Sequence, residues 1–167
     1  MKTDPRRLLL ASYPWVQTME TRFADMDVNR HLNNVAFSRF FEETRIRFNG
    51  TLFANANADA NANANANANA NANANADANA NASPRPRYLV AHVAIDYLGE
   101  GSYPEPVTMT YAVGSIGRTS FRSQKAMFQN DRCIALCDTV LVHRGDAGPA
   151  PLPDALRSRL EAFGLKG

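Results

Sequence analysis

The sequence predicts a domain of the α+β class, in which one long helix packs against an antiparallel sheet. An apolar stripe with helical spacing follows residue 34, and four runs rich in Val, Ile, Tyr, Phe and Thr follow between residues 88 and 143. Turns that contain Gly or Pro separate these runs, which favours antiparallel pairing of neighbours. A helix with so wide an aromatic stripe needs a broad apolar surface, and a sheet that wraps around it provides one.

The helix is predicted over about residues 34–48. Its apolar stripe follows the spacing i, i+3, i+4, i+7 and i+11 and consists of Phe37, Phe40, Phe41, Thr44 and Phe48. On the opposite face Glu43 precedes Arg47 by four residues, which is the favourable order for an ion pair. Asn33 or Asn34 is suited to cap the first turn, and Asn49-Gly50 is suited to end the helix.

Strands are predicted on both sides of the helix. PWVQTMETRF, residues 14–23, alternates in the way of a half-buried strand, and the later runs cover about residues 88–98, 105–114, 119–129 and 132–143. Asn130-Asp131 is suited to a tight hairpin between the last two runs. A short helix from about residue 153 to residue 163 follows them.

Residues 54–82 alternate Ala with Asn, interrupted only by Asp59 and Asp77. This segment has no large side chains to bury, so we predict a flexible, low-complexity insertion within a single domain that spans residues 1–167. Two other interpretations stay open at this point. Asn-rich repeats can stack as strands between molecules, and so regular a repeat is also consistent with filler or an engineered segment.

Composition excludes several classes of function. The net charge is +2 without any block of like charges, which argues against a partner that is nucleic acid or a membrane surface. No segment approaches the roughly 20 apolar residues that span a bilayer. Cys133 and Cys137 lie in an apolar run and have neither disulfide-framework nor metal-ligand spacing. Free thiols in the reducing cytosol are the simplest interpretation, so a cytoplasmic protein without a metal site is expected.

The stretch DMDVNRHLNN, residues 25–34, concentrates acids, a histidine and carboxamides between the first strand and the helix. A helix start offers backbone N–H groups without intrahelical partners, and its dipole favours negative charge. Next to a carboxylate, such donors suit a reaction that develops an oxyanion. The stretch also fits an ordinary polar loop, with Asp25 as a structural acid and with Asn33 and Asn34 as caps alone.

RFADMDVNRHLNNVAFSRFFEETRIRF, residues 22–48, resembles the signature of hotdog-fold acyl-CoA thioesterases of the 4-hydroxybenzoyl-CoA thioesterase type. Two later stretches, VAIDYLGEGSYPEPV and SIGRTSF, are similar to that family at the corresponding places. The resemblance implies a hotdog fold, an antiparallel sheet wrapped around one long central helix. It also implies a homodimer or tetramer with its site at a subunit interface, and no cofactor, because coenzyme A is part of the substrate.

The resemblance also implies roles for individual residues. Asp27 matches the family's catalytic aspartate, as general base or nucleophile, and His31, Asn33 and Asn34 match its His-x-Asn-Asn sequence. DVNRH is similar to a stretch of plant acyl-carrier-protein thioesterases, which adds Asn29 to the catalytic candidates.

Two positions depart from these patterns. Ser115 stands where the plant enzymes have a glutamate, and Arg30 stands where many members of the first family have Gly. Arg30, Arg118 and Ser120 are the candidates for substrate binding.

The predicted function is therefore hydrolysis of an acyl thioester, carried by coenzyme A or by acyl-carrier protein, to the free acid and the thiol. The alternative is a protein with the same fold that binds or scaffolds acyl thioesters without catalysis, because a fold does not determine a function. Neither a metal ion nor a nucleic-acid partner is expected.

Overall fold

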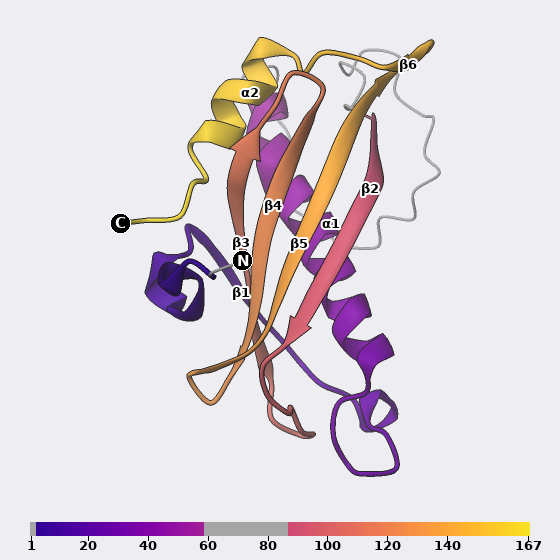
Figure 1. Cartoon of the computed structure of the whole chain (residues 1–167), viewed down its shortest axis with the longest axis vertical. Coiled ribbons are helices and arrows are strands. Elements are labelled where there is room, and N and C mark those ends of the chain that lie inside the picture. Colours follow the sequence, from indigo (N-terminus) through magenta and orange to yellow (C-terminus); the bar gives the residue numbers. More distant parts are fainter. Residues whose placement is uncertain (1–2, 59–86) are drawn as a thin grey trace.

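The structure, a computed structural model, describes residues 3–58 and 87–167 of the chain (Figure 1). Short 3₁₀ helices at Pro5–Leu8, Leu10–Ser12 and Phe23–Asp25 flank the first strand. The helices and strands, in chain order, are β1 (Trp15–Met19), α1 (Asn34–Ala58), β2 (Arg87–Tyr97), β3 (Val107–Ile116), β4 (Ser120–Gln129), β5 (Arg132–Gly145), β6 (Gly148–Pro149) and α2 (Asp154–Glu161).

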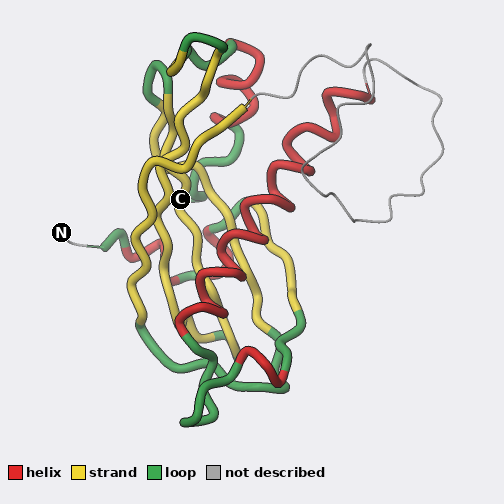
Figure 2. Tube along the Cα trace, turned by 90° about the vertical axis from the view of Figure 1, so that its right-hand side faces the viewer, coloured by secondary structure: helices red, strands yellow, loops and turns green. Residues whose placement is uncertain are grey.

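The strands form one antiparallel sheet in the order β1-β3-β4-β5-β2, with β6 paired to β5. Figure 2 shows α1 lying across the concave face of this sheet. This arrangement confirms the predicted α+β hotdog fold. The predicted hairpin is also confirmed, because Asn130 and Asp131 have φ values of 52° and 60°, as a tight turn of the type I′ class requires.

The aromatic stripe of α1 is buried as predicted. Phe37, Phe41 and Phe48 are at most 3% exposed. Phe48 stacks on Tyr111 of β3 with 3.7 Å between ring centroids. Trp15 of β1 packs edge-on against Phe48 with 6.1 Å between centroids. Because each fully buried Phe contributes roughly 1.5–3 kcal/mol, this contact holds α1 against the sheet.

The predicted end of the helix at Asn49-Gly50 is wrong, because α1 continues to Ala58. A tertiary contact explains the difference. Leu52 is buried in a cluster with Leu156 and Leu160, and the guanidinium of Arg159 donates to the carbonyl of Leu52 at 3.2 Å. These contacts with α2 lie beyond the stop signal and outweigh it.

Residues 54–58 of the predicted Ala/Asn insertion therefore belong to the backbone of α1. The remainder, residues 59–82, lies outside the described residues, so its flexibility stays a prediction.

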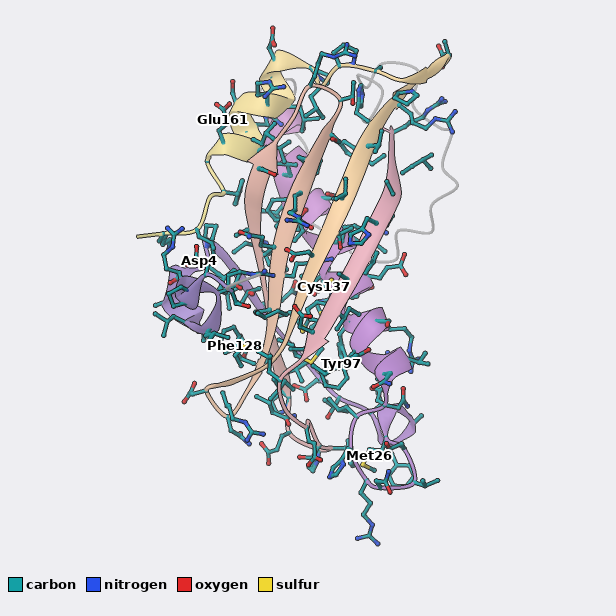
Figure 3. The ribbon with its side chains drawn as sticks, in the orientation of Figure 1. Asp4, Met26, Tyr97, Phe128, Cys137 and Glu161 are labelled. Carbon is teal, nitrogen blue, oxygen red and sulfur yellow. The ribbon has the colours of Figure 1, made fainter. Side chains whose placement is uncertain are left out.

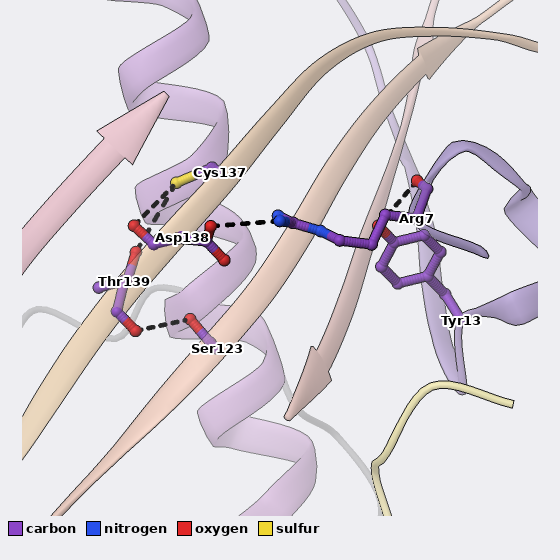
Figure 4. A network of polar contacts seen from close by, with 6 residues as sticks. All are labelled: Arg7, Tyr13, Ser123, Cys137, Asp138 and Thr139. Atoms are coloured by element: carbon purple, nitrogen blue, oxygen red, sulfur yellow. Dashed lines mark hydrogen bonds and ion pairs between the residues drawn. The ribbon is translucent and has the colours of Figure 1, made fainter. Parts of the chain in front are cut away.

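The convex face of the sheet carries a smaller cluster that the N-terminal segment covers. Tyr13 packs edge-on against Phe128, and its hydroxyl donates to the carbonyl of Arg7 at 3.0 Å. The Arg7 guanidinium reaches Asp138 of β5 at 3.2 Å (Figure 4). Burial raises the pKa of Tyr13 to about 12. The N-terminal segment thus closes one face of the sheet, while α1 closes the other.

β2 forms one edge of the sheet and pairs only with β5 among the described strands. Its apolar side chains are unusually open, with Leu89, Val90, Val93 and Tyr97 between 44% and 52% exposed. A long apolar edge strand of this kind is a template for pairing with another chain.

Candidate active site

Asp25 anchors both ends of the loop between β1 and α1. The residue is 5% exposed, and its two oxygens accept from the backbone N–H of Arg22 at 2.9 Å and from the guanidinium of Arg39 at 3.0 Å. Its carbonyl accepts from the backbone N–H of Asn33 at 2.9 Å. The first acid of the motif is therefore a structural residue that closes the loop onto the start of α1.

Asp27 lies at the beginning of that closed loop, and its side chain is exposed. Its Oδ1 accepts from the backbone N–H groups of Asn29 at 2.8 Å and of His31 at 3.2 Å. Its Oδ2 has no hydrogen-bond partner among the described residues. A catalytic acid at the end of the first strand would be expected to be partly desolvated, but Asp27 is exposed in the single chain. The carboxylate is nevertheless held in one orientation with one oxygen open.

Arg30 has a φ of 65°, in the left-handed region that glycine favours. The backbone N–H of Arg30 donates to the carbonyl of Asp27 at 3.1 Å, and the left-handed φ then turns the chain so that the carbonyl of His31 accepts from the N–H of Asp27 at 2.8 Å. A side chain there costs roughly 1–2 kcal/mol. The departure from the family pattern at Arg30 therefore keeps the backbone conformation that Gly adopts and adds an exposed cation to the loop.

His31 points toward Glu100 and not toward Asp27. Its Nε2 lies 3.2 Å from a carboxylate oxygen of Glu100, in the connection between β2 and β3. The next residue, Leu32, is buried and donates its backbone N–H to the carbonyl of Gly101 at 2.8 Å. A Cβ at Gly101 would lie 2.8 Å from the end of the Leu32 side chain, so a larger residue there would require the Leu32 and Ile134 side chains to move.

The two asparagines at the start of α1, Asn33 and Asn34, make different contacts. The side-chain oxygen of Asn33 accepts from the backbone N–H of Ala36 at 2.8 Å, which confirms it as the cap of α1. The Asn34 side chain is exposed, and its carboxamide makes no hydrogen bond among the described residues. Asn29 is also exposed and contacts Asp27 through its backbone only.

Arg118 and Ser120 lie at the other end of the sheet from Asp27. Arg118 belongs to the turn between β3 and β4, where its carbonyl accepts from the backbone N–H of Leu152 at 2.9 Å, and Ser120 begins β4. Figure 1 shows this turn beside α2, whereas Figure 3 shows Met26 of the motif loop at the opposite end, near Tyr97. A single chain thus brings Asp27, Asn29, Arg30, His31, Asn33 and Asn34 together, but not Arg118 and Ser120.

Two hollows flank α1. The larger, of about 680 Å³, lies between α1 and β1 and is lined by charged side chains that include Asp25 and Arg39. The smaller, of about 250 Å³, lies between α1 and β2 and is lined by Ser38, Phe41, Glu42, Arg45, Val90, Val93, Ile95, Lys125 and Thr139. Asp27 lines neither hollow.

Comparison with known proteins assigns the family. A sequence model described as the thioesterase-like superfamily matches residues 21–160, which is most of the chain. The chain belongs to the thioesterase-like superfamily. No curated protein matches it in sequence.

Solved structures share the superfamily fold at low identity. A thioesterase from Thermus thermophilus, complexed with coenzyme A and Zn, is 24% identical with a TM-score of 0.69 over 92% of this chain and 96% of that one. A predicted thioesterase from Bacillus stearothermophilus is 22% identical, with a TM-score of 0.69 over 92% and 98%. A gentisyl-coenzyme A thioesterase is 11% identical, with a TM-score of 0.63 over 87% and 99%. At these identities the likeness shows the fold.

The sequence did not predict two residues, Glu100 and Lys125, as members of the candidate site. Glu100 lies between two glycines in a strand connection, and only its contact with His31 marks it. Lys125 had a readable signal, because alternation in β4 places it on the same face as Phe121 and Met127, which are core residues. Lys125 is 2% exposed, and burial lowers the pKa of its ammonium.

Within residues 3–58 and 87–167, no group of three His, Cys, Asp or Glu side chains is placed to hold a metal ion. The same described part of the chain contains no helix long and apolar enough to cross a membrane.

Arg30→Gly is expected to raise the free energy of unfolding by about 1 kcal/mol, because glycine adopts the left-handed conformation without steric cost. Chemical denaturation monitored by circular dichroism measures this change. Arg30→Ala is the matched control, since it removes the same charge and keeps the strain. An equal gain in both variants would show that charge, and not backbone conformation, sets the cost.

Lys125→Met is expected to raise the melting temperature at neutral pH by a few degrees, because a buried ammonium is costly and methionine fills a similar volume. In the unfolded chain the Lys125 ammonium loses its proton near the ordinary pKa of 10.5, whereas in the folded chain it loses that proton at lower pH. Wild-type stability therefore rises with pH in that window, and the advantage of the variant shrinks there. Thermal melts of the wild type and the variant across pH measure this difference in melting temperature, with Lys166→Met at an exposed position as control. A difference that does not change with pH would contradict desolvation of Lys125 as its cause.

Proposed function

We propose that the chain hydrolyses an acyl thioester of coenzyme A to the free acid and the thiol. The observation that carries the proposal is the Asp27 carboxylate, whose Oδ1 is fixed by two backbone N–H groups while Oδ2 stays open. It lies in the loop that leads from β1 into α1, in a member of the thioesterase-like superfamily. Acyl-carrier protein is the other carrier that the same chemistry would accept.

The reaction needs an attacking oxygen and donors for the carbonyl oxygen. Asp27 either removes a proton from water or attacks the thioester carbon itself through the open Oδ2. The backbone N–H groups of Asn34 and Val35 have no partners among the described residues, because only the N–H of Ala36 receives the Asn33 cap. These two groups and the Asn34 carboxamide are the proposed donors to the oxyanion. A thiol has a pKa of about 8.5, so its thiolate departs readily near neutral pH.

Asp27→Asn is expected to lower kcat/KM about 10²- to 10⁴-fold, because the amide neither accepts a proton from water nor attacks a thioester. Release of free thiol from a panel of acyl-CoAs of different chain length measures it. Asp25→Asn is the matched comparison, since the same chemical change two residues earlier removes a buried ion-paired acid and is expected to lower the melting temperature.

The outcomes separate the two candidate functions. Turnover unchanged in Asp27→Asn would contradict the catalytic role of this acid. Binding of acyl-CoA by the wild-type chain without thiol release at any chain length would favour the non-catalytic binding or scaffolding function.

We also propose that two copies pair through their β2 edges. The unpaired edge and the exposed apolar side chains of β2 support this pairing. An antiparallel two-fold pairing turns the second copy end for end, so its β3–β4 turn lies at the end of the joint sheet that carries the first copy's Asp27 loop. Arg118 and Ser120 of a second copy then lie on the side where the coenzyme of the bound thioester extends.

Leu89→Glu is expected to convert the dimer to a monomer, because two-fold symmetry places two carboxylates in one apolar edge. Size-exclusion chromatography with light scattering measures the mass. Val16→Glu is the matched control, since Val16 is 47% exposed on β1 at the other edge of the sheet. A wild-type chain that is monomeric would contradict pairing through β2. A dimer that persists in Leu89→Glu and dissociates in Val16→Glu would contradict it as well.

A cytoplasmic location is part of the same proposal. Cys133 and Cys137 are both free thiols, and burial raises the pKa of Cys133 to about 11, which makes this thiol unreactive. No cofactor is proposed beyond the coenzyme A of the substrate itself.

A further inference from the structure

Lys125 lies in a cross-strand row on the face of the sheet that contacts α1. Tyr111 of β3 pairs with Lys125 of β4, which pairs with Cys137 of β5, which in turn pairs with Ile95 of β2. Its neighbours in this row are apolar or aromatic, apart from the thiol of Cys137. The Lys125 side chain lies against α1 and lines the inner wall of the 250 Å³ hollow between α1 and β2.

The Lys125 ammonium forms no ion pair among the described residues, although nearby Cys137 and Asp138 partly favour its charged form. Its Nζ donates to the hydroxyl of Thr139 at 2.8 Å and to the carbonyl of Phe41 at 3.4 Å, and the Cys137 side chain also lies within its hydrogen-bonding reach. It also lies 5.8 Å from the centroid of the Phe41 ring. Glu42, the carboxylate that lines the same hollow, pairs instead with Arg45 at 3.0 Å.

A purely structural role does not account for this residue. Lysine is almost never fully buried unless it is paired, and a buried charge without a partner is costly. Methionine or leucine at the same place would fill the space without that cost. A residue that lowers stability at the wall of a hollow is better explained by a ligand that supplies the missing charge.

The dimensions of the hollow define the ligand. The hollow begins beside Ser38, in the second turn of α1, and the Lys125 contact at Phe41 lies seven residues beyond Asn34, or about 10 Å along the helix axis. A volume of 250 Å³ accommodates about eight non-hydrogen atoms at the roughly 30 Å³ that a water occupies in the liquid. Phe41, Val90 and Val93 form apolar walls, whereas Lys125 and Thr139 form a polar end.

We propose that Lys125 binds a carboxylate at the far end of the acyl group, so that the substrate is the coenzyme A thioester of a medium-chain dicarboxylic acid. The inference rests on the proposed function and adds the class of acid. The thioester carbonyl lies at the start of α1, the methylene chain follows the apolar walls, and the terminal carboxylate accepts from Lys125 Nζ and Thr139 Oγ1.

The test compares two non-hydrolysable thioethers of coenzyme A that differ only at their tips, S-(5-carboxypentyl)-coenzyme A and S-hexyl-coenzyme A. Isothermal titration calorimetry of the full chain is expected to show binding of the carboxylate about 10- to 100-fold tighter, as for a charge-assisted hydrogen bond. Lys125→Met is expected to abolish that preference and to leave the hexyl compound bound. Lys166→Met, the same change at an exposed lysine, is expected to keep the preference.

Equal affinity of the wild-type chain for the two thioethers would overturn the inference, and so would a preference that persists in Lys125→Met. If Lys125→Met does not fold, Lys125→Gln serves as the second variant with the same expected loss. Thiol release from adipyl-CoA and hexanoyl-CoA separates the two proposals. Hydrolysis without a carboxylate preference would reject the inference alone, whereas a Lys125-dependent preference without hydrolysis would reject the proposed function alone.

Discussion

The burial of the aromatic stripe of α1 against the concave face of the sheet is the contact on which the other features depend. Phe48 stacked on Tyr111 fixes the middle of the helix, and Phe37, which meets Tyr97 at 5.3 Å, fixes its first turn beside the end of β2. With the helix held in this way, its start lies beside the motif loop and its flanks leave the two hollows. The site is thus a consequence of one packed helix.

The two acids of the motif have different roles, since Asp25 stabilises the loop and Asp27 is the proposed catalytic acid. Asp25 is buried and fully occupied, and it closes the loop by joining Arg22, Asn33 and Arg39. Asp27, held by backbone N–H groups at one oxygen, keeps the other oxygen open. The loop from Asp25 to Asn33 tolerates the left-handed conformation of Arg30 because a backbone hydrogen bond joins its two ends. Local strain and an open carboxylate are therefore supported by the neighbouring buried acid Asp25 and its ion pair with the exposed Arg39.

Local patterns predicted most of the fold, whereas contacts between distant segments were beyond them. The stripe of α1, the strand at β3 and the Asn130-Asp131 turn depend on near neighbours in sequence, and the sequence predicted them correctly. The extension of α1 depends on Leu52 meeting α2, and the orientation of His31 depends on Glu100, so neither follows from local sequence.

The predicted site divides along the same line. The residues from Asp27 to Asn34 are neighbours because the chain is continuous there, whereas Arg118 belongs to the turn between β3 and β4, at the other end of the sheet in the single chain. Lys125 could have been predicted from the sequence, because strand alternation places it on the inward face and a charged residue on that face is unusual.

The structure of the chain bound to a non-hydrolysable thioether analogue of an acyl-CoA tests the central claim most directly. The account predicts that the sulfur lies at the start of α1, with the first carbon of the acyl chain about 3–3.5 Å from Asp27 Oδ2 or from a water that Oδ2 holds. The chain then extends into the hollow that contains Lys125. An analogue bound instead in the larger hollow beside Asp25, with its sulfur remote from Asp27, would contradict the account.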